Sequence, residues 1–162
     1  MSKRRQLLIV LADGEHARFV RPGADNILHT DKAEDSRWAH KRSSDLGSDR
    51  PGATVHSDST AHHALAPRHD LHVLEKVGFA HAIAEQLNES EANGEFDSLL
   101  LVAPTHTLDA IRGHLTRAAA GRIAAVLAKD LVKTPDHELA PHLFPWVRRA
   151  KRAAPYEARS GN

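Results

Sequence analysis

A chain of 162 residues has the length of one domain and can bury a substantial hydrophobic core. Its formal net charge of +1 provides no overall field toward nucleic acid or a membrane. The absence of cysteine excludes disulfides, thiolate catalysis and cysteine-ligated zinc, and the low aromatic content of 4% predicts an aliphatic core.

The amino-terminal part predicts three strands connected by tight turns. Gln6–Ala12 is a continuous apolar run, typical of a strand that is buried on both faces. His16–Arg21 and Asn26–Thr30 are the next strand candidates, and the turn dipeptides Asp13–Gly14 and Pro22–Gly23 separate the three. Such short connections favour an antiparallel meander.

Residues 31–70 are polar and rich in Asp, Ser, Arg and His, which predicts a long loop. We expect residues 35–69 to be the most mobile part of the chain, because so polar a segment cannot offset the entropy of ordering it. Asp70 can then cap a helix that continues to about Glu91, where Asn93–Gly94 stops it.

Two further apolar runs predict strands in the second half. We expect Ser98–Ala103 and Arg122–Ala128 to join Gln6–Ala12 as the central strands of the sheet, because all three are continuously apolar. The helix between them begins near Thr105 or Thr107, either of which can cap it.

A final helix is predicted over Asp136–Arg152, interrupted or kinked at Pro141 and Pro145. The order β-β-β, loop, α-β-α-β-α predicts a single α/β domain with a mixed sheet, in which a meander is followed by parallel strands and helices flank the sheet. We place this domain at residues 1–145 and a basic carboxy-terminal tail at residues 146–162. The apolar run after Arg5 is too short for a signal peptide or a membrane helix, so we expect a cytoplasmic protein with no membrane partner.

Histidines provide the first candidate site. Four of them (His62, His63, His69 and His72), with His56 nearby, offer imidazole ligands for zinc or nickel. A divalent transition metal is therefore the one cofactor for which we see candidate ligands. The alternative is a solvated polar loop, which the lack of a His-Glu-x-x-His spacing favours.

A second candidate site is a strand-end pocket formed by Asp13, Arg18, Lys129 and Asp130. Open α/β sheets tend to bind ligands at strand ends, and two carboxylates beside two cations can hold a metal or a phosphate. The alternative is structural and is favoured by the local sequence: Asp13 forms the hairpin turn and Asp130 caps a helix.

The third candidate site is a basic run of Arg148, Arg149, Lys151 and Arg152, close to Trp146 and Tyr156. Cations beside aromatic rings suit RNA phosphates and base stacking. A solvated helix end, whose cations complement the helix dipole, is an equally good interpretation. The chain has no Gly-x-Ser-x-Gly, Gly-x-Gly-x-x-Gly or phosphate-loop motif, so we assign no catalytic residue.

Three blocks of the sequence resemble the bacterial host-attachment family, proteins required for attachment to host cells. They are LIVLADGEHARFV (8–20), FDSLLLVAPTHTLDAIRGHL (96–115) and AKDLVKTPDHELAPHL (128–143). This family is in turn similar to the middle domain of archaeal and eukaryotic class-1 peptide release factors. The resemblance implies a mixed sheet of the release-factor or ribonuclease-H-like type.

In those release factors, a Gly-Gly-Gln tripeptide in a long loop before a long helix enters the peptidyl transferase centre. The loop at 35–69 lies at the matching place but lacks the tripeptide, and the only glutamines are Gln6 and Gln86. The resemblance therefore implies a non-catalytic module that docks on the ribosome, on other structured RNA or on a protein partner, with the oligomeric state open. The alternative is a hydrolase of peptidyl-tRNA or nucleic acid that uses the histidine-rich loop, with or without a metal.

Overall fold

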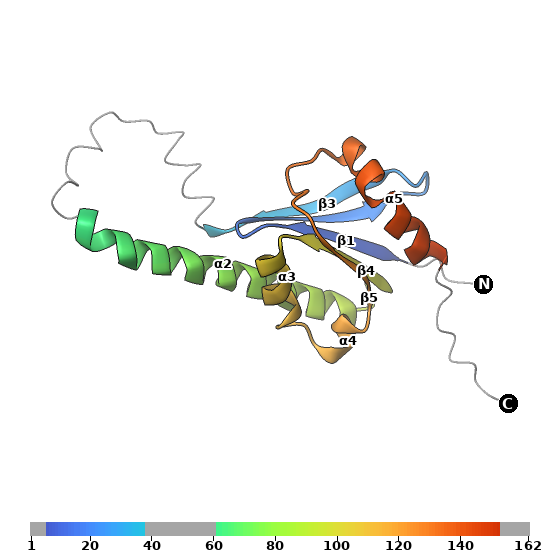
Figure 1. The fold of residues 1–162 in the computed structure, drawn as a ribbon. Helices are drawn as coiled ribbons and strands as arrows, with labels where there is room; N and C mark the ends of the chain where they lie inside the picture. Colours follow the sequence, from blue (N-terminus) through green and yellow to red (C-terminus); the bar gives the residue numbers. More distant parts are fainter. Residues whose placement is uncertain (1–5, 38–60, 153–162) are drawn as a thin grey trace.

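A computed structural model of the chain describes residues 6–37 and 61–152, except the side chains of 61–70 and 149–152. Its strands are β1 (Leu7–Ala12), β2 (His16–Pro22), β3 (Leu28–Asp35), β4 (Ser98–Ala103) and β5 (Ile123–Ala128). Its helices are α2 (Ala61–Ala92), α3 (Thr105–Arg112), α4 (Arg117–Ala120) and α5 (Asp136–Arg152). The strands form one five-stranded sheet in the order β3-β2-β1-β4-β5 (Figure 1).

The sheet is mixed, as the connection lengths predict. β1 pairs antiparallel with β2, and β2 pairs antiparallel with β3, which confirms the meander. β4 lies parallel to β1 on one side and to β5 on the other, so each link to these strands is a crossover that contains helices. The predicted single α/β domain with helices flanking a mixed sheet is confirmed.

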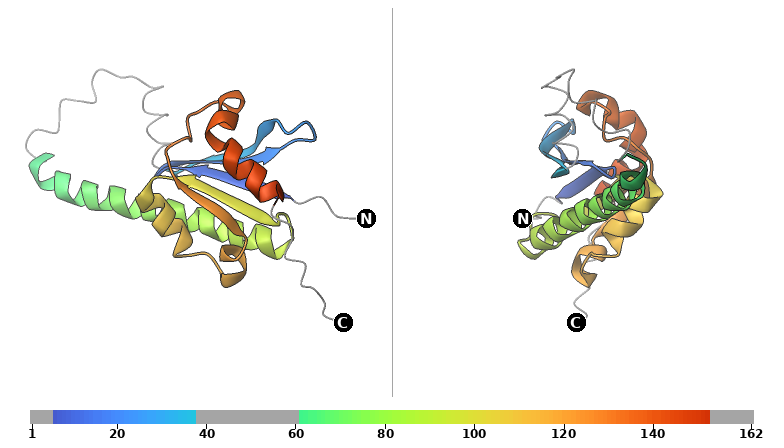
Figure 2. Two further views of the ribbon diagram at one scale, coloured as in Figure 1. Left: turned by 45° about the vertical axis from the view of Figure 1, so that its right-hand side comes forward. Right: turned by 90° about the vertical axis from the view of Figure 1, so that its left-hand side faces the viewer.

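The two faces of the sheet have separate hydrophobic cores. Leu8, Val10 and Ala12 face α2 and α3, whereas Leu7 and Ile9 face α5. Figures 1 and 2 show α2, α3 and α4 on one face of the sheet and α5 on the other. Every residue of β1 and β4 is buried, which agrees with the continuous apolar runs in their sequences.

The predicted position of the strand at Arg122–Ala128 is wrong. β5 is the last strand of the sheet beside β4, and only Leu127 in it is buried, whereas Ala124 and Ala128 are exposed. The segment reads as an apolar run because it is rich in alanine, a residue so small that its exposure costs little. Apolar character alone therefore did not distinguish an edge strand from a central one.

The long loop is shorter than predicted at both ends. β3 continues to Asp35, beyond the predicted end at Thr30, because its backbone pairs with β2 although its side chains are polar and largely exposed. α2 begins at Ala61 instead of Asp70, in a segment whose alanines and leucine favour a helix. Residues 38–60, which include His56, lie outside the described ranges, so the predicted mobility concerns mostly residues without a description.

The first turns of α2 project beyond the ends of the strands (Figures 1 and 2). From Phe79 onward its inner face is buried, with Ile83 and Leu87 fully enclosed. Before that point Leu71 and Leu74 remain 57% and 65% exposed.

The short connections in the second half differ from the prediction in their details. Neither Thr105 nor Thr107 caps α3; its N-cap is Pro104, which has no side-chain acceptor. The short helix α4 was not predicted, and Thr116 caps it by accepting the N–H of Ala119 at 3.2 Å.

α5 is a single helix that is not interrupted at Pro141 or Pro145. Both prolines are exposed, while Leu139, Leu143 and Val147 form its buried stripe on the sheet. Packing of that stripe compensates for the missing backbone donors. No helix in the described ranges is long and apolar enough to cross a membrane.

Candidate functional site

Arg18 on β2 fixes the segment that leads into α5. Its Nη1 donates to the carbonyl of Val132 at 2.9 Å and also to that of Thr134, and its Nη2 pairs with Asp136, the first residue of α5. Nε and Nη2 both donate to Thr30 Oγ1, at 3.3 Å and 3.2 Å. The side chain of Arg18 is only 15% exposed, and its nitrogens all donate to groups of the protein itself.

Asp136 completes this network from the helix side. Its Oδ2 accepts the backbone N–H of Thr30 at 2.9 Å, and its Oδ1 accepts the Thr30 hydroxyl as well as the Arg18 guanidinium. Partial burial acts to raise the pKa of Asp136, but the hydrogen bonds from Thr30 and the charge of Arg18 outweigh it and lower the pKa. The network holds the amino-terminal end of α5 against β2 and β3.

Two cation–aromatic pairs lie along α5. The guanidinium carbon of Arg148 lies 4.9 Å from the ring centroid of Phe144, which is 52% exposed. Lys129 Nζ lies 5.7 Å from the ring of Trp146, which is partly buried against the core. Residues 144 and 146 are two positions apart on a helix, so these pairs lie on different sides of the buried stripe.

Helical spacing groups the basic positions of α5. Positions 148, 151 and 152 follow Phe144 at i+4, i+7 and i+8, so the backbone places all four on one face. Position 149 falls outside it. We call Phe144, Arg148, Lys151 and Arg152 the basic face of α5; the side chains of Arg149, Lys151 and Arg152 lie outside the described part.

The predicted strand-end residues have separate environments. Asp13 Oδ1 accepts the N–H groups of Glu15 and His16 at 2.7 Å and 2.6 Å and so forms the β1–β2 turn. Asp130 lies in the connection before α5, begins no helix, and is exposed, as is Lys129. No hydrogen bond or ion pair joins any two of Asp13, Arg18, Lys129 and Asp130 in the structure.

Of the predicted metal ligands, only the side chain of His72 is described. It faces Glu15, with Nε2 3.6 Å from Oε1. His62, His63 and His69 lie in the first turns of α2, and their side chains are outside the described part. Among the side chains that the structure does describe, no three His, Asp or Glu residues group as metal ligands.

A pocket of about 600 Å³ lies where β1 and β4 end, bordered by the β1–β2 turn, by α2 and by the first turn of α3. Its polar residues include Asp13, Glu15, Lys76, His106 and Thr107, and its walls are apolar. We call it the β1–β4 pocket. It lies at the carboxyl ends of two parallel strands, the usual place for ligands in open α/β sheets.

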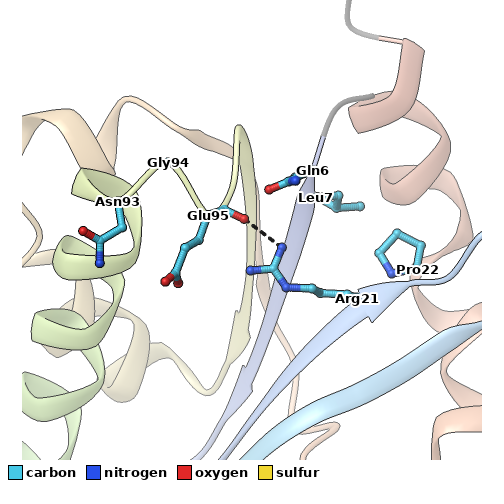
Figure 3. Close-up of a pocket in the computed structure, with 7 residues that line it drawn as sticks. All are labelled: Gln6, Leu7, Arg21, Pro22, Asn93, Gly94 and Glu95. Carbon is cyan, nitrogen blue, oxygen red and sulfur yellow. Dashed lines mark hydrogen bonds between the residues drawn. The ribbon is translucent and has the colours of Figure 1, made fainter. Parts of the chain in front are cut away.

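A second pocket, of about 710 Å³, lies at the opposite end of the sheet (Figure 3). Arg21 reaches across it from β2 and donates to the carbonyl of Glu95 at 2.9 Å, and its Nε lies 3.3 Å from Asp31. The guanidinium is thus used to join β2 to the turn after α2. This pocket is a weaker candidate for binding a ligand.

Sequence patterns missed Thr30, Asp136 and Phe144 as parts of a site. The segment Thr134–Pro135–Asp136 has the signal of a helix start, but nothing local shows that Arg18 is its partner. The sequence analysis did not single out Phe144, which its exposure and its contact with Arg148 in the fold set apart.

The fold and these surfaces define a single-domain α/β protein with a five-stranded mixed sheet and helices on both faces. The chain belongs to the host-attachment family, described as "protein required for attachment to host cells", whose sequence profile matches residues 8–143. A search of curated proteins finds no match to the chain. The family description names a phenotype and not a chemical reaction.

Proposed function

We propose that this protein is a non-catalytic, release-factor-like module that binds ribosomal or other structured RNA through the basic face of α5. The observation that carries the proposal is the Arg148 guanidinium 4.9 Å from the ring of the exposed Phe144, on the face that also holds positions 151 and 152. Cations contact phosphates, and an exposed ring stacks on an unpaired base.

The finer fold type is part of the same proposal. A release-factor or ribonuclease-H-like fold is supported by the antiparallel meander followed by parallel crossovers, and by the segment 38–60 directly before the long helix α2. Release factors carry Gly-Gly-Gln at that place. This chain has no such tripeptide, which favours binding without peptidyl-tRNA hydrolysis. Ribosome docking would place the protein in the cytoplasm.

Co-sedimentation with ribosomes at several salt concentrations tests the proposal. If binding is through phosphates, the logarithm of the binding constant should fall linearly with the logarithm of the salt concentration. Each phosphate that the protein neutralises contributes about 0.7–0.9 to the steepness of this line. The combined variant Arg148→Ala, Lys151→Ala and Arg152→Ala should bind weakly and with a smaller slope. The single change Arg149→Ala should weaken binding less than Arg148→Ala or Arg152→Ala, because position 149 lies off this face.

A matched control removes the same charge elsewhere. Arg112, Arg117 and Lys133 are exposed and make no ion pair in the described ranges, so changing these three to Ala should leave most of the binding. Equal weakening in both triple variants would show a non-specific charge effect. Salt-insensitive association that survives the changes on α5 would indicate a protein partner and overturn the RNA proposal.

Phe144→Ala separates stacking from charge. Because Phe144 is 52% exposed, its removal should leave the fold intact while weakening RNA binding by about 1–3 kcal/mol, the usual contribution of one base stacked on an aromatic ring. The salt slope should not change, because the cations that bind phosphates are all still present. Unchanged affinity would contradict a stacking role for this ring.

A further inference from the structure

The RNA proposal leaves the β1–β4 pocket without a role. The pocket measures about 600 Å³, within the range of small-ligand sites, and combines apolar walls with a few polar groups. Its walls include Val73 and Val77 of α2, which are 47% and 39% exposed, and Ala110 of α3. Its polar groups include donors on α2 and α3 and the carboxylates of Asp13 and Glu15 in the β1–β2 turn.

Donors come first from the start of α3. Its N-cap, Pro104, offers no side-chain acceptor, and no acidic residue stands in its first turn. A helix leaves its first backbone N–H groups without a partner inside the helix. Those of Thr105, His106 and Thr107 have no acceptor within the described structure. An anionic group satisfies them and also complements the helix dipole.

Thr107 provides an independent observation. The residue is only 8% exposed, and its hydroxyl forms no hydrogen bond among the residues that the structure describes. Every fully enclosed side-chain oxygen or nitrogen in those residues does have a partner. The Thr107 oxygen is therefore not fully enclosed, and the space that this residue borders is the pocket. A buried hydroxyl usually has a partner, which here a ligand atom can supply.

The β1–β2 turn and α2 supply the remaining polar groups. The stem of Lys76 lies against the turn, since a Cβ built on Gly14 would be 2.8 Å from Lys76 Cδ, and its ammonium makes no ion pair within the described ranges. Asp13 uses Oδ1 for both turn N–H groups, whereas no bond in that part of the chain uses Oδ2. The pocket thus combines anion-binding donors with the carboxylate of Asp13, while the second carboxylate of its lining, Glu15, faces His72.

We propose that the β1–β4 pocket binds an apolar α-amino acid residue that has a free carboxylate, either a free amino acid or the carboxy-terminal residue of a peptide. The carboxylate accepts from the first turn of α3, from the Thr107 hydroxyl and from Lys76. The ligand's amino or amide N–H donates to Asp13. Its side chain packs on Val73 and Val77.

Calorimetric titration of the full chain with leucine and with the tripeptide Ala-Ala-Leu tests this proposal. Each acid is compared with its carboxy-terminal amide, which keeps the shape and removes the charge. Loss of charge-assisted hydrogen bonds should weaken binding at least about tenfold. The acid that binds more tightly identifies whether the ligand is a free amino acid or a peptide end. Failure of both acids to bind, or amides that bind as well as acids, would overturn the proposal.

Two variants locate the binding. Thr107→Val keeps the shape of the side chain and should weaken binding of the acid about fivefold, the usual effect of one hydrogen bond. Lys76→Met keeps the stem against Gly14 and should weaken the acid but not the amide. Lys133→Met, at an exposed lysine away from the pocket, is the matched control. Thermal unfolding should confirm that all three variants fold, and equal affinity in Thr107→Val and the unchanged protein would place the ligand elsewhere.

Discussion

Arg18 joins three segments that lie far apart in the chain. Its partners Thr30 and Asp136 are 12 and 118 residues away, and it also holds the carbonyls of Val132 and Thr134. The side chain is 15% exposed, so water replaces few of these bonds when the arginine is removed. The geometry therefore gives Arg18 a structural role at the base of α5.

Arg18→Met should destabilise the fold by about 2 kcal/mol, because two partly buried carbonyls and a carboxylate lose a charged donor. The free energy of unfolding in urea measures the effect. Arg112→Met, at an exposed arginine without an ion pair in the described structure, should change it by less than about 0.5 kcal/mol. Equal effects of the two changes would contradict the structural role.

The lowered pKa of Asp136 predicts an acid-dependent contribution to stability. Burial raises this pKa, but the bonds from Thr30 and Arg18 lower it below the ordinary value of 3.8, so the folded state favours the charged carboxylate. The contribution is complete above the ordinary pKa and is lost as the pH falls through the lower pKa of the folded protein.

Asp136→Asn removes this titration. The stability difference between the unchanged protein and the variant should be constant from about pH 5 to pH 7 and should shrink below about pH 4. Thermal unfolding at each pH measures it. A difference that stays constant down to about pH 2 would show that the network does not depend on the charge of Asp136.

At the scale of elements, α5 shows how packing overrides local propensity. Two prolines lie inside it, yet the helix runs from Asp136 to Arg152, because Leu139, Leu143 and Val147 are buried and α5 packs on β1, β3 and β5. The prolines lie on the exposed side, where water can bond to the backbone carbonyls that lack an N–H donor.

Pro141→Ala should therefore stabilise the protein by about 1–2 kcal/mol. Proline inside a helix is about 3 kcal/mol less favourable than alanine, and about 1 kcal/mol of this is offset because proline also restricts the unfolded chain. Chemical denaturation measures the gain. Pro104→Ala, at the N-cap of α3, makes no such change inside a helix and should have little effect. A loss of stability in Pro141→Ala would mean that the proline itself packs the helix.

The histidines at the start of α2 remain a predicted metal site. His72 already faces Glu15 at 3.6 Å, so a metal would compete with that contact. Titration with zinc and nickel should give heat in the unchanged protein and none in a variant with His62, His63, His69 and His72 changed to Ala. The same heat in both proteins would end the hypothesis.

At the scale of the whole molecule, the proposed roles are spatially separate. The basic face lies on α5, which covers one face of the sheet, whereas the β1–β4 pocket is bordered by α2 and α3 on the other (Figures 1 and 2). We therefore expect variants in one proposed site to leave the other unchanged.

The whole protein should not release peptides from ribosomes, even where it binds them. In the proposed release-factor-like fold, the segment at the place of the catalytic loop contains Gly47 and Gly52, separated by Ser48, Asp49, Arg50 and Pro51, and no glutamine. Proline cannot donate an N–H, and an aspartate brings a negative charge toward a reaction that develops charge on oxygen. A peptidyl-tRNA hydrolysis assay measures this. Turnover above the buffer rate that is lost on deletion of residues 38–60 would establish the hydrolase alternative.

The sequence alone determined the features that depend on local chemistry. Turn dipeptides at Asp13–Gly14 and Pro22–Gly23 predicted the meander, and the run Ser98–Ala103 predicted the boundaries of β4, because neighbouring residues decide turn geometry and strand burial. The three blocks at 8–20, 96–115 and 128–143 also carried the resemblance to the host-attachment family, which the match over residues 8–143 confirms.

Only the tertiary structure decided which residues meet across the chain. β5 became an edge strand because it pairs with β4 alone among the described strands, and β3 was extended by backbone pairing with β2 that its polar side chains do not show. The same holds for Arg18 and Asp136, which are 118 residues apart, and for Thr107, which borders a pocket formed by three elements. Such contacts depend on how helices and strands pack against each other. The residues that neighbour each partner in the sequence do not indicate them.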